Sequence, residues 1–434
     1  MQISGAVPQE LADGLPPFQM ELEGNEIVSL SDSFCEKKSM MSGAVAKFGC
    51  DAILCKPGSA SQFGRQNSTD SNCEPCDDAK FWGSTQCGNE FSEKKILMKF
   101  YESCIGEKWY QKSNWNDDGI SICKWQGISC NDDGQVNAIR LGSNNLGGSP
   151  PPELFDLPKL RWLWLHSNPM QFSFESIGSA KELIELRLDS TELFSLQGIG
   201  AAASLEILDL RFNNIKEIPE ELLQLTQLES LSIANNEIYG KLPNNLDNLK
   251  NLKALRLGSN KIFGKLPSFE GFTRMQVLDL SQNDLSGTIP SSFMINRAGI
   301  FLHLEINLAS NELTGAVPVE LDKFQALTLY LRDNKFTGIP EELCDDDNSQ
   351  WNSGGVGKYQ CDAILCPPGK YSSLGRQRDE KTVCTNCDKS IYYGQSFCGE
   401  EKAASASSGW TALRGKGQWF ATIGMIGLIF GWIV

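Results

Sequence analysis

A short motif with two apolar residues and a polar residue at fixed spacing recurs along the chain and constrains the fold more than any other feature. A clear copy is Leu163-x-Leu165-x-x-Asn168. Nine copies, 22 to 28 residues apart, end at Asn144, Asn168, Thr191, Asn213, Asn236, Asn260, Asn283, Asn311 and Asn334. Repetition at this period is typical of a solenoid, in which each unit stacks on its neighbours.

Each motif predicts one short strand with both apolar side chains pointing into the solenoid, paired in parallel with the next strand. The asparagine carries a donor and an acceptor, so it can satisfy backbone groups where the chain leaves the strand. Thr191 has half of that capacity and predicts a looser turn. The five extra residues between Asn283 and Asn311 predict a bulge on the convex side, around 291–300.

Several motifs continue as x-Leu-x-Gly-x-x-Pro, as in Leu285-Ser-Gly-Thr-Ile-Pro290. With this continuation, residues 136–343 resemble the plant-type leucine-rich repeat of receptor-like ectodomains. The resemblance implies an α/β solenoid with a curved parallel β-sheet and short helical or 3-10 convex segments. It also implies small disulfide-rich modules at the ends of the array.

A cysteine-rich module occurs twice in the chain. Cys50–Cys87 aligns with Cys361–Cys398 without a gap, with 17 of 38 residues identical. Fifteen cysteines in all favour an oxidising compartment and disulfides. The modules loosely resemble ephrin-receptor-like ones; six cysteines allow 15 pairings, and the sequence does not choose among them. A zinc site at the C-x-x-C pairs is a rival interpretation, which the absence of histidine in both modules disfavours.

Residues 92–135 are expected to cap the repeats, with Ser92 beginning a helix. The run Cys123-Lys-Trp-Gln-Gly-Ile-Ser-Cys130 resembles the plant-type cap motif, and the resemblance implies a disulfide between Cys123 and Cys130. Cys104 has no evident partner and is expected to be a buried thiol.

The duplication extends upstream of the cysteines, since Ser4-Gly-Ala-Val-Pro8 parallels Thr314-Gly-Ala-Val-Pro318. We therefore expect Met1 to fall inside a repeat of a longer tandem protein. The predicted organisation is an end of an earlier array (1–34), module 1 (35–91), cap (92–135), repeats (136–343), module 2 (344–400) and a spacer with an apolar segment (401–434).

The last segment predicts membrane attachment at the cell surface, on the extracellular side. Residues 419–434 are uncharged and mostly apolar, and small residues followed by a spacer precede them. This order fits a glycosylphosphatidylinositol (GPI) signal with Ser407 or Ser408 as the attachment residue. A short transmembrane helix is the alternative. Asn67-Ser-Thr is the one N-glycosylation sequon.

The residues beside the inward leucines predict a ligand-binding concave face. Large aromatics such as Trp162 and Trp164 gain little from solenoid packing there and indicate a contact site. The candidate ligand-binding residues are Trp162, Trp164, His166, Arg187, Asp189, Asp209, Arg211, Arg256, Asp279 and Tyr330. The competing interpretation is a solvated face of complementary charges.

Net charge and motifs narrow the function. A formal charge of −15 argues against a nucleic-acid partner. The sequence has two histidines and shows no catalytic triad and no metal-binding cluster, so we expect no enzyme activity, metal or cofactor. It also shows no kinase signature. We expect a receptor-like recognition protein without a kinase domain, which binds a peptide, glycan or protein and signals, if at all, through a co-receptor. The alternative is an adhesive wall-associated protein or an inhibitor of a secreted hydrolase.

Overall fold

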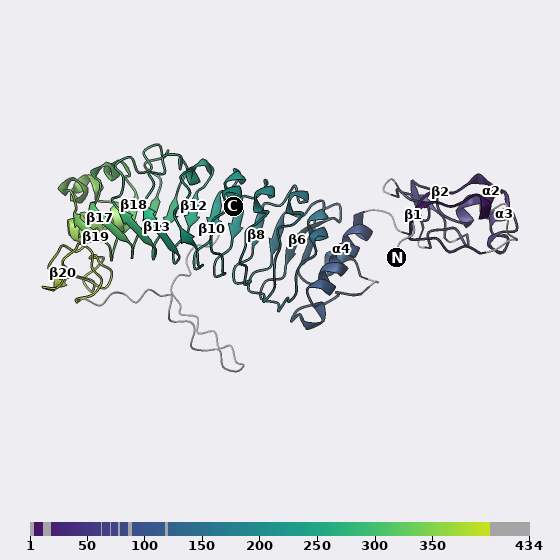
Figure 1. The fold of residues 1–434 in the computed structure, drawn as a ribbon, viewed down its shortest axis with the longest axis horizontal. Helices are drawn as coiled ribbons and strands as arrows, with labels where there is room; N and C mark the ends of the chain where they lie inside the picture. Colours follow the sequence, from purple (N-terminus) through teal and green to yellow (C-terminus); the bar gives the residue numbers. More distant parts are fainter. Residues whose placement is uncertain are drawn as a thin grey trace.

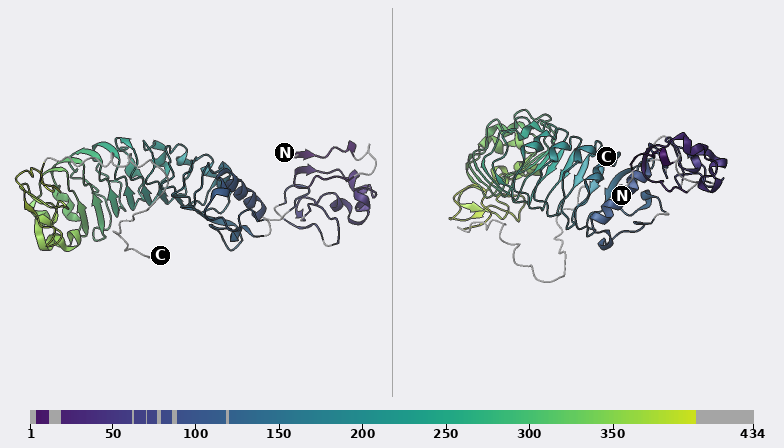
Figure 2. Two further views of the ribbon diagram at one scale, coloured as in Figure 1. Left: turned by 90° about the horizontal axis from the view of Figure 1, so that it is seen from below. Right: turned by 45° about the vertical axis from the view of Figure 1, so that its right-hand side comes forward.

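The computed structural model describes residues 4–11, 19–61, 63–69, 71–76, 79–85, 89–117 and 120–399. Its main body is a curved solenoid built on a ten-stranded sheet, with one parallel strand from each of the nine repeats (Figures 1 and 2). The strands are β5 (Ile128–Cys130), β6 (Val136–Arg140), β7 (Trp162–Trp164), β8 (Glu185–Arg187), β9 (Ile207–Asp209), β10 (Ser230–Ser232), β12 (Ala254–Arg256), β14 (Val277–Asp279), β16 (Leu304–Asn307) and β18 (Leu327–Tyr330). β5 pairs antiparallel with β6 and closes the sheet at that end. The predicted solenoid class is confirmed.

The repeat asparagines form the predicted hydrogen-bond ladder. Asn168 Nδ2 donates to the carbonyls of Leu165 in its own repeat and Leu141 in the preceding one, at 2.9 Å each. Its Oδ1 accepts from the amides of Asn144 and Leu146. One buried side chain thus pairs four backbone groups that the turn would otherwise leave without partners.

Thr191 shows what the ladder loses when the amide is replaced. Its hydroxyl donates to Leu188 O in its own repeat, at 2.7 Å. Among the hydrogen bonds of the described residues, none runs from this hydroxyl to the preceding repeat, where an asparagine would reach Leu165 O. The link between these two repeats therefore lacks one side-chain bond.

A second parallel sheet runs beside the first, and the sequence did not predict it. Its five strands are β11 (Tyr239–Gly240), β13 (Lys261–Lys265), β15 (Asp284–Gly287), β17 (Glu312–Ala316) and β19 (Lys335–Gly338). These strands are the x-Leu-x-Gly segments that follow the asparagines. Glycines such as Gly264 and Gly315 have positive φ there, which L-residues adopt at a cost. Repeats without that segment contribute no strand to this sheet.

Short 3-10 helices cover the convex side, as expected. They are η5 (Pro152–Asp156), η6 (Ile177–Ser179), η7 (Ile199–Ala201), η8 (Glu220–Gln224), η9 (Leu246–Asn248), η10 (Val319–Lys323) and η11 (Glu341–Cys344). The longer repeat forms a turn-rich insertion around Arg297, which is buried and donates to the carbonyls of Met275 and Gly299. Burial lowers the pKa of this guanidinium.

The cap begins with helix α4 (Asn89–Ser103), so Ser92 lies inside the helix and the prediction that it starts the helix is wrong. Leu97, Phe100 and Cys104 are fully buried against the first repeats. Cys104 is a free, buried thiol, and a disulfide joins Cys123 to Cys130.

The disulfides described in module 1 join the same pairs of cysteines as their counterparts in module 2. Module 2 holds Cys344–Cys361, Cys366–Cys384 and Cys387–Cys398, and module 1 holds the counterparts Cys35–Cys50 and Cys55–Cys73. The elements of module 2 are α5 (Trp351–Tyr359) and the hairpin β20 (Lys370–Tyr371) and β21 (Thr385–Asn386). Module 1 contains α2 (Asp32–Glu36), α3 (Val45–Phe48), β3 (Ser59–Ala60) and β4 (Glu74–Pro75). It forms a lobe of its own in Figure 1.

The chain before module 1 folds like the repeat before module 2. β1 (Ser4–Ala6) pairs in parallel with β2 (Glu26–Ser29), with Ser4 opposite Glu26. The corresponding strands β17 and β19 also pair in parallel, with Thr314 of β17 opposite Lys335 of β19. The repeat-like sequence upstream of module 1 therefore adopts the same strand pairing.

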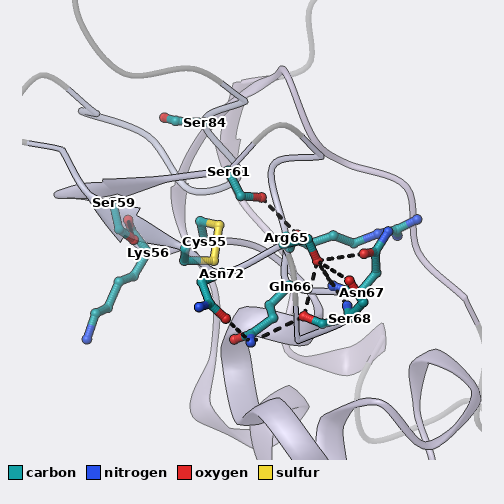
Figure 3. The surroundings of a disulfide bond; sticks show 12 residues. Cys55, Lys56, Ser59, Ser61, Arg65, Gln66, Asn67, Ser68, Asn72 and Ser84 are labelled. Carbon is teal, nitrogen blue, oxygen red and sulfur yellow. Dashed lines mark hydrogen bonds between the residues drawn. A yellow bond between two sulfur atoms is a disulfide. The ribbon is translucent and has the colours of Figure 1, made fainter.

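The predicted modification sites differ in what the structure describes of them. Asn67 is exposed in a loop near the Cys55–Cys73 disulfide, and its Oδ1 accepts from Ser71 (Figure 3). Ser407, Ser408 and the apolar segment 419–434 lie outside the described residues. Within the described part of the chain, no helix combines the length and apolar character that a membrane crossing requires.

Candidate functional site

The strand register places the predicted central residues in one row across the concave sheet. Arg140, Trp164, Arg187 and Asp209 stand opposite one another on β6, β7, β8 and β9. The leucine next to each of these residues on its strand points into the solenoid, and Leu163 is fully buried. The alternation of side chains along a strand therefore puts this row on the concave surface.

Trp164 lies between two guanidinium groups. The Arg140 guanidinium carbon is 4.8 Å from its ring centroid, and that of Arg187 is 4.5 Å away. Trp162 contacts Arg140 at 5.7 Å and Arg161 at 5.0 Å. Stacking of this kind contributes about 0.5–2 kcal/mol per contact and fixes the rings in place. Both tryptophans are half-buried.

A buried carboxylate holds the second arginine in position. Glu185 is 6% exposed, and its Oε1 accepts from Arg187 Nε at 2.5 Å. Arg187 is thereby fixed on the Trp164 side and contributes little net charge. Glu185 was not among the predicted site residues, although its place just before the leucine of β8 puts it beside Trp162.

His166 lies one repeat beyond a glycine that makes room for it. A Cβ on Gly142 would approach the imidazole to 2.3 Å, so the ring occupies the space above that backbone. Two polar atoms here, His166 Nδ1 and Trp164 Nε1, are buried without a hydrogen-bond partner in the described part of the chain. Such atoms carry a free-energy penalty that a ligand group could remove.

A charged cluster continues the site towards the middle of the sheet. Asp209 and Arg211 form a two-pronged ion pair, with Nη2–Oδ2 and Nε–Oδ1 distances of 2.7 and 2.9 Å. The bond to Asp209 raises the pKa of Arg211. Asp189 lies beside the pair, and burial together with the charge of Asp209 raises its pKa, against the opposing effect of His166 and Arg211.

The remaining predicted residues lie farther along the sheet, away from the tryptophans. Arg256 and Asp279 stand opposite each other on β12 and β14. Asp279 Oδ1 accepts from the Ser281 hydroxyl at 2.6 Å. Tyr330, on β18, packs under the guanidinium of Arg376 from module 2 at 4.6 Å. The structure therefore divides the predicted residues into a Trp-Arg group at one end and a Tyr-Arg group at the other.

The described residues contain no cluster of histidine, cysteine and carboxylate groups with the geometry of a metal site. The cap and the repeats match the profiles of known protein families. The family profiles that match are the leucine-rich-repeat N-terminal domain at residues 92–131 and leucine-rich repeats at 203–262 and 274–294.

The curated relatives are plant receptor kinases. Receptor-like protein kinase BRI1-like 3 of Arabidopsis thaliana is 36% identical over 239 residues, which is 54% of this chain and 17% of the relative. Pollen receptor-like kinase 2 of the same plant is 31% identical over 211 residues, or 47% of this chain and 28% of the relative. The chain thus matches less than a third of the length of either.

Two solved structures align with the solenoid at a TM-score of 0.53 and 27% identity. Both contain the Arabidopsis receptor kinase HAESA, one as its leucine-rich-repeat ectodomain with an IDA peptide hormone extended at its N-terminus, the other with IDA and the co-receptor SERK1. The first alignment covers 61% of this chain and 44% of that one, and the second covers 60% and 44%.

Proposed function

Because the chain is a leucine-rich-repeat protein of the plant receptor type, we propose that it recognises an extended peptide at the cell surface with the concave face of its solenoid. The observation that carries the proposal is the Arg140–Trp164–Arg187 row, with Trp162 beside it. These rings add nothing to the inward-facing core, and stacked arginines hold them in one orientation. Preorganised aromatic groups of this kind are typical of the residues that dominate binding energy.

A peptide suits this face for two further reasons. Trp164 Nε1 and His166 Nδ1 are buried without a hydrogen-bond partner in the described part of the chain. Movement of Arg140 and Arg187, which flank Trp164, would let a peptide carbonyl reach the indole N–H. The HAESA ectodomain, which aligns with this solenoid, was solved in complex with a peptide hormone. That property belongs to HAESA, and its transfer to this chain is part of the proposal.

The proposed activity is binding without chemical conversion of the ligand. A signal would pass to a membrane partner of the co-receptor kind. Attachment to the membrane through residues 401–434 and an extracellular location are parts of the same proposal. Release of the protein from intact cells by a phosphatidylinositol-specific phospholipase would support the lipid anchor, whereas retention would favour a transmembrane helix.

The test is selection of a displayed library of random peptides, about ten residues long, against the purified protein and two double variants. Trp162→Ala with Trp164→Ala should abolish the enrichment of peptides. Phe194→Ala with Tyr239→Ala is the matched control, because both side chains are exposed aromatics outside the concave row, at 66% and 70%. Equal enrichment on wild type and on the tryptophan variant would refute the proposed site.

A further inference from the structure

A polar cavity of about 420 Å³ lies where the last strands of the concave sheet meet module 2. Tyr330 and Arg332 line it from the last repeat, Lys358 from α5, and Arg376 and Arg378 from the loop after β20. The cavity is therefore continuous with the concave sheet but completed by the cysteine module. A leucine-rich repeat alone would not form it.

The cavity lining carries four cations and, among its described residues, no carboxylate. Arg376 is 8% exposed and donates through Nη1 to Leu329 O at 3.1 Å. Arg332 donates to Ser373 O at 3.2 Å. Two of the four cations have a carboxylate on the next residue of the chain: Asp333 Oδ2 is 3.9 Å from Arg332 Nε, and Asp379 Oδ2 is 3.4 Å from Arg378 Nε on the exposed side.

The duplicated module shows what this junction looks like when the charge is balanced. In module 1, Arg65 donates to Met20 O at 2.9 Å, as Arg376 does to Leu329 O. There, however, Arg65 Nη2 also lies 3.6 Å from Glu23 Oε1. The arginine that joins each module to its repeat is thus paired with a carboxylate in the first copy.

The residue at the place of Glu23 in the second copy is Arg332. Leu22-Glu23-Gly-Asn25 aligns with Leu331-Arg332-Asp-Asn334. The structure agrees: a Cβ on Gly64 would lie 2.6 Å from the Glu23 Cβ, and one on Gly375 would lie 2.4 Å from the Arg332 Cβ. A carboxylate that neutralises the buried arginine has therefore been replaced by a second guanidinium.

Two more positions become more positive, whereas Gly24 and Ser68 are replaced by Asp333 and Asp379, which pair with Arg332 and Arg378 outside the cavity lining. Glu21 corresponds to Tyr330, and Asn67 corresponds to Arg378. The first copy therefore has the carboxylates of Glu21 and Glu23 where the second has the phenol of Tyr330 and the guanidinium of Arg332. Gathering like charges around a small volume is unfavourable unless an anion occupies it. The first copy makes the same junction without the added cations, so the contact between module and repeat does not require them.

We propose that this cavity binds one oxyanionic group, a carboxylate or a sulfate or phosphate ester, carried by a peptide that lies along the concave sheet. The peptide part rests on the proposed function, and the anion site itself does not. Guanidinium groups bind such oxyanions through paired N–H donors. An anionic polysaccharide suits the face less well, because Asp189, Asp209 and Asp279 lie on the path and would repel repeated negative charges.

The spacing of the two groups fits one extended peptide. From Trp164 on β7 to Tyr330 on β18 there are seven strand-to-strand steps. At about 4.8 Å per step they span about 34 Å. An extended chain of about ten residues covers that distance. A peptide that contacts Trp164 near one end can therefore place an acidic group in the cavity.

The first test uses inorganic sulfate alone, titrated calorimetrically at constant ionic strength with chloride as the exchanged anion. Wild type should bind sulfate, and Arg332→Glu should weaken binding by about tenfold or more, because it restores the pairing of the first copy. Arg274→Glu, on an exposed convex arginine, makes the same charge change and should leave binding unaltered. Arg378→Asn, the residue of the first copy, should weaken binding in an independent way.

Equal sulfate affinity in wild type and in both cavity variants would overturn the site, and so would no binding by a folded wild type. The second test repeats the peptide selection. Enrichment of Asp, Glu or sulfotyrosine near one end, lost on Arg332→Glu, supports the proposal. Tighter binding of an oligogalacturonate than of any selected peptide overturns the peptide assignment. If sulfate binding depends on Arg332 while Trp162 and Trp164 prove irrelevant, the anion site stands and the proposed function fails.

Discussion

The guanidinium carbon of Arg187 lies 4.5 Å from the centroid of the Trp164 ring, on the neighbouring strand of the concave sheet. Arg140 occupies the strand on the other side of the same ring. A tryptophan flanked in this way presents mainly its edge to a ligand. It therefore suits an extended chain with hydrogen-bonding groups better than a flat ring that needs an open aromatic face.

Leu163 and Trp164 are neighbours with opposite roles, and their truncation should separate binding from stability. Leu163 is fully buried, so Leu163→Ala should lower the free energy of unfolding by about 2–5 kcal/mol. Trp164→Ala removes a half-buried ring and its cation–π contacts, and should cost about 1–2 kcal/mol. Urea unfolding followed by circular dichroism measures both. A larger loss for Trp164→Ala than for Leu163→Ala would show that the tryptophan is a core residue.

Asn168 should be among the residues on which the solenoid depends most. Asn168→Ala removes the partners of two carbonyls and two amides, and each buried group left unpaired costs about 1–3 kcal/mol. Thermal unfolding should show a lower midpoint for this variant. Asn251→Ala is the control, because Asn251 makes only exposed side-chain bonds, one donated to Thr226 O and one accepted from Arg274. Similar midpoints for the two variants would contradict the structural role of the ladder.

The sequence predicted those features that depend on a periodic pattern. Leucines at alternate positions specify which side chains enter the core, and the asparagine offset fixes the turn, so the concave row could be predicted residue by residue. The second sheet was not predicted because a segment that contains glycine is typical of a turn. Its strands form by pairing with the same segment in adjacent repeats, which the pattern within one repeat does not indicate.

The cluster of cations between module 2 and the last repeat was harder to predict, because it depends on contacts between residues far apart in the sequence. Arg376 contacts the concave sheet at Leu329 O of β18, and it belongs to a module held by the disulfides Cys366–Cys384 and Cys387–Cys398. The alignment of Glu23 with Arg332 was already present in the duplicated sequence. Its meaning required the structure, which places each residue beside the arginine that joins module and repeat.

Asp189 should make stability depend on pH. Its pKa is raised in the folded protein by burial and by Asp209, so the folded state holds the proton more tightly than the unfolded state. The free energy of unfolding should therefore fall as the pH rises from 3.8, the ordinary pKa of an aspartate, through the raised pKa of Asp189. It should stay reduced at higher pH. Asp189→Asn should melt at a higher temperature than wild type at pH 7, and the difference should shrink towards pH 4.

Asp209→Asn provides the opposite control for that experiment. Asp209 pairs with Arg211 through two short bonds, so losing its charge should lower the melting temperature at pH 7. Differential scanning calorimetry at several pH values distinguishes the two variants. A lower melting temperature for Asp189→Asn at pH 7 would show that Asp189 gains more from His166 and Arg211 than burial costs it.

Cys104 should be chemically silent in the native protein. Its side chain is fully buried, and burial raises the pKa of the thiol, so the thiolate that reacts with alkylating reagents is scarce. Iodoacetamide at pH 8 should leave Cys104 unmodified in the native state and alkylate it after unfolding in guanidinium without reductant. Peptide mapping by mass spectrometry identifies the modified residue, and Cys104→Ala should lose that signal.

Because Cys104 packs against the first repeats beneath α4, its rate of labelling in intermediate denaturant would report how early this cap separates from the solenoid. Rapid alkylation in the absence of denaturant would mean that the cap opens readily in solution, contrary to its packing in the structure.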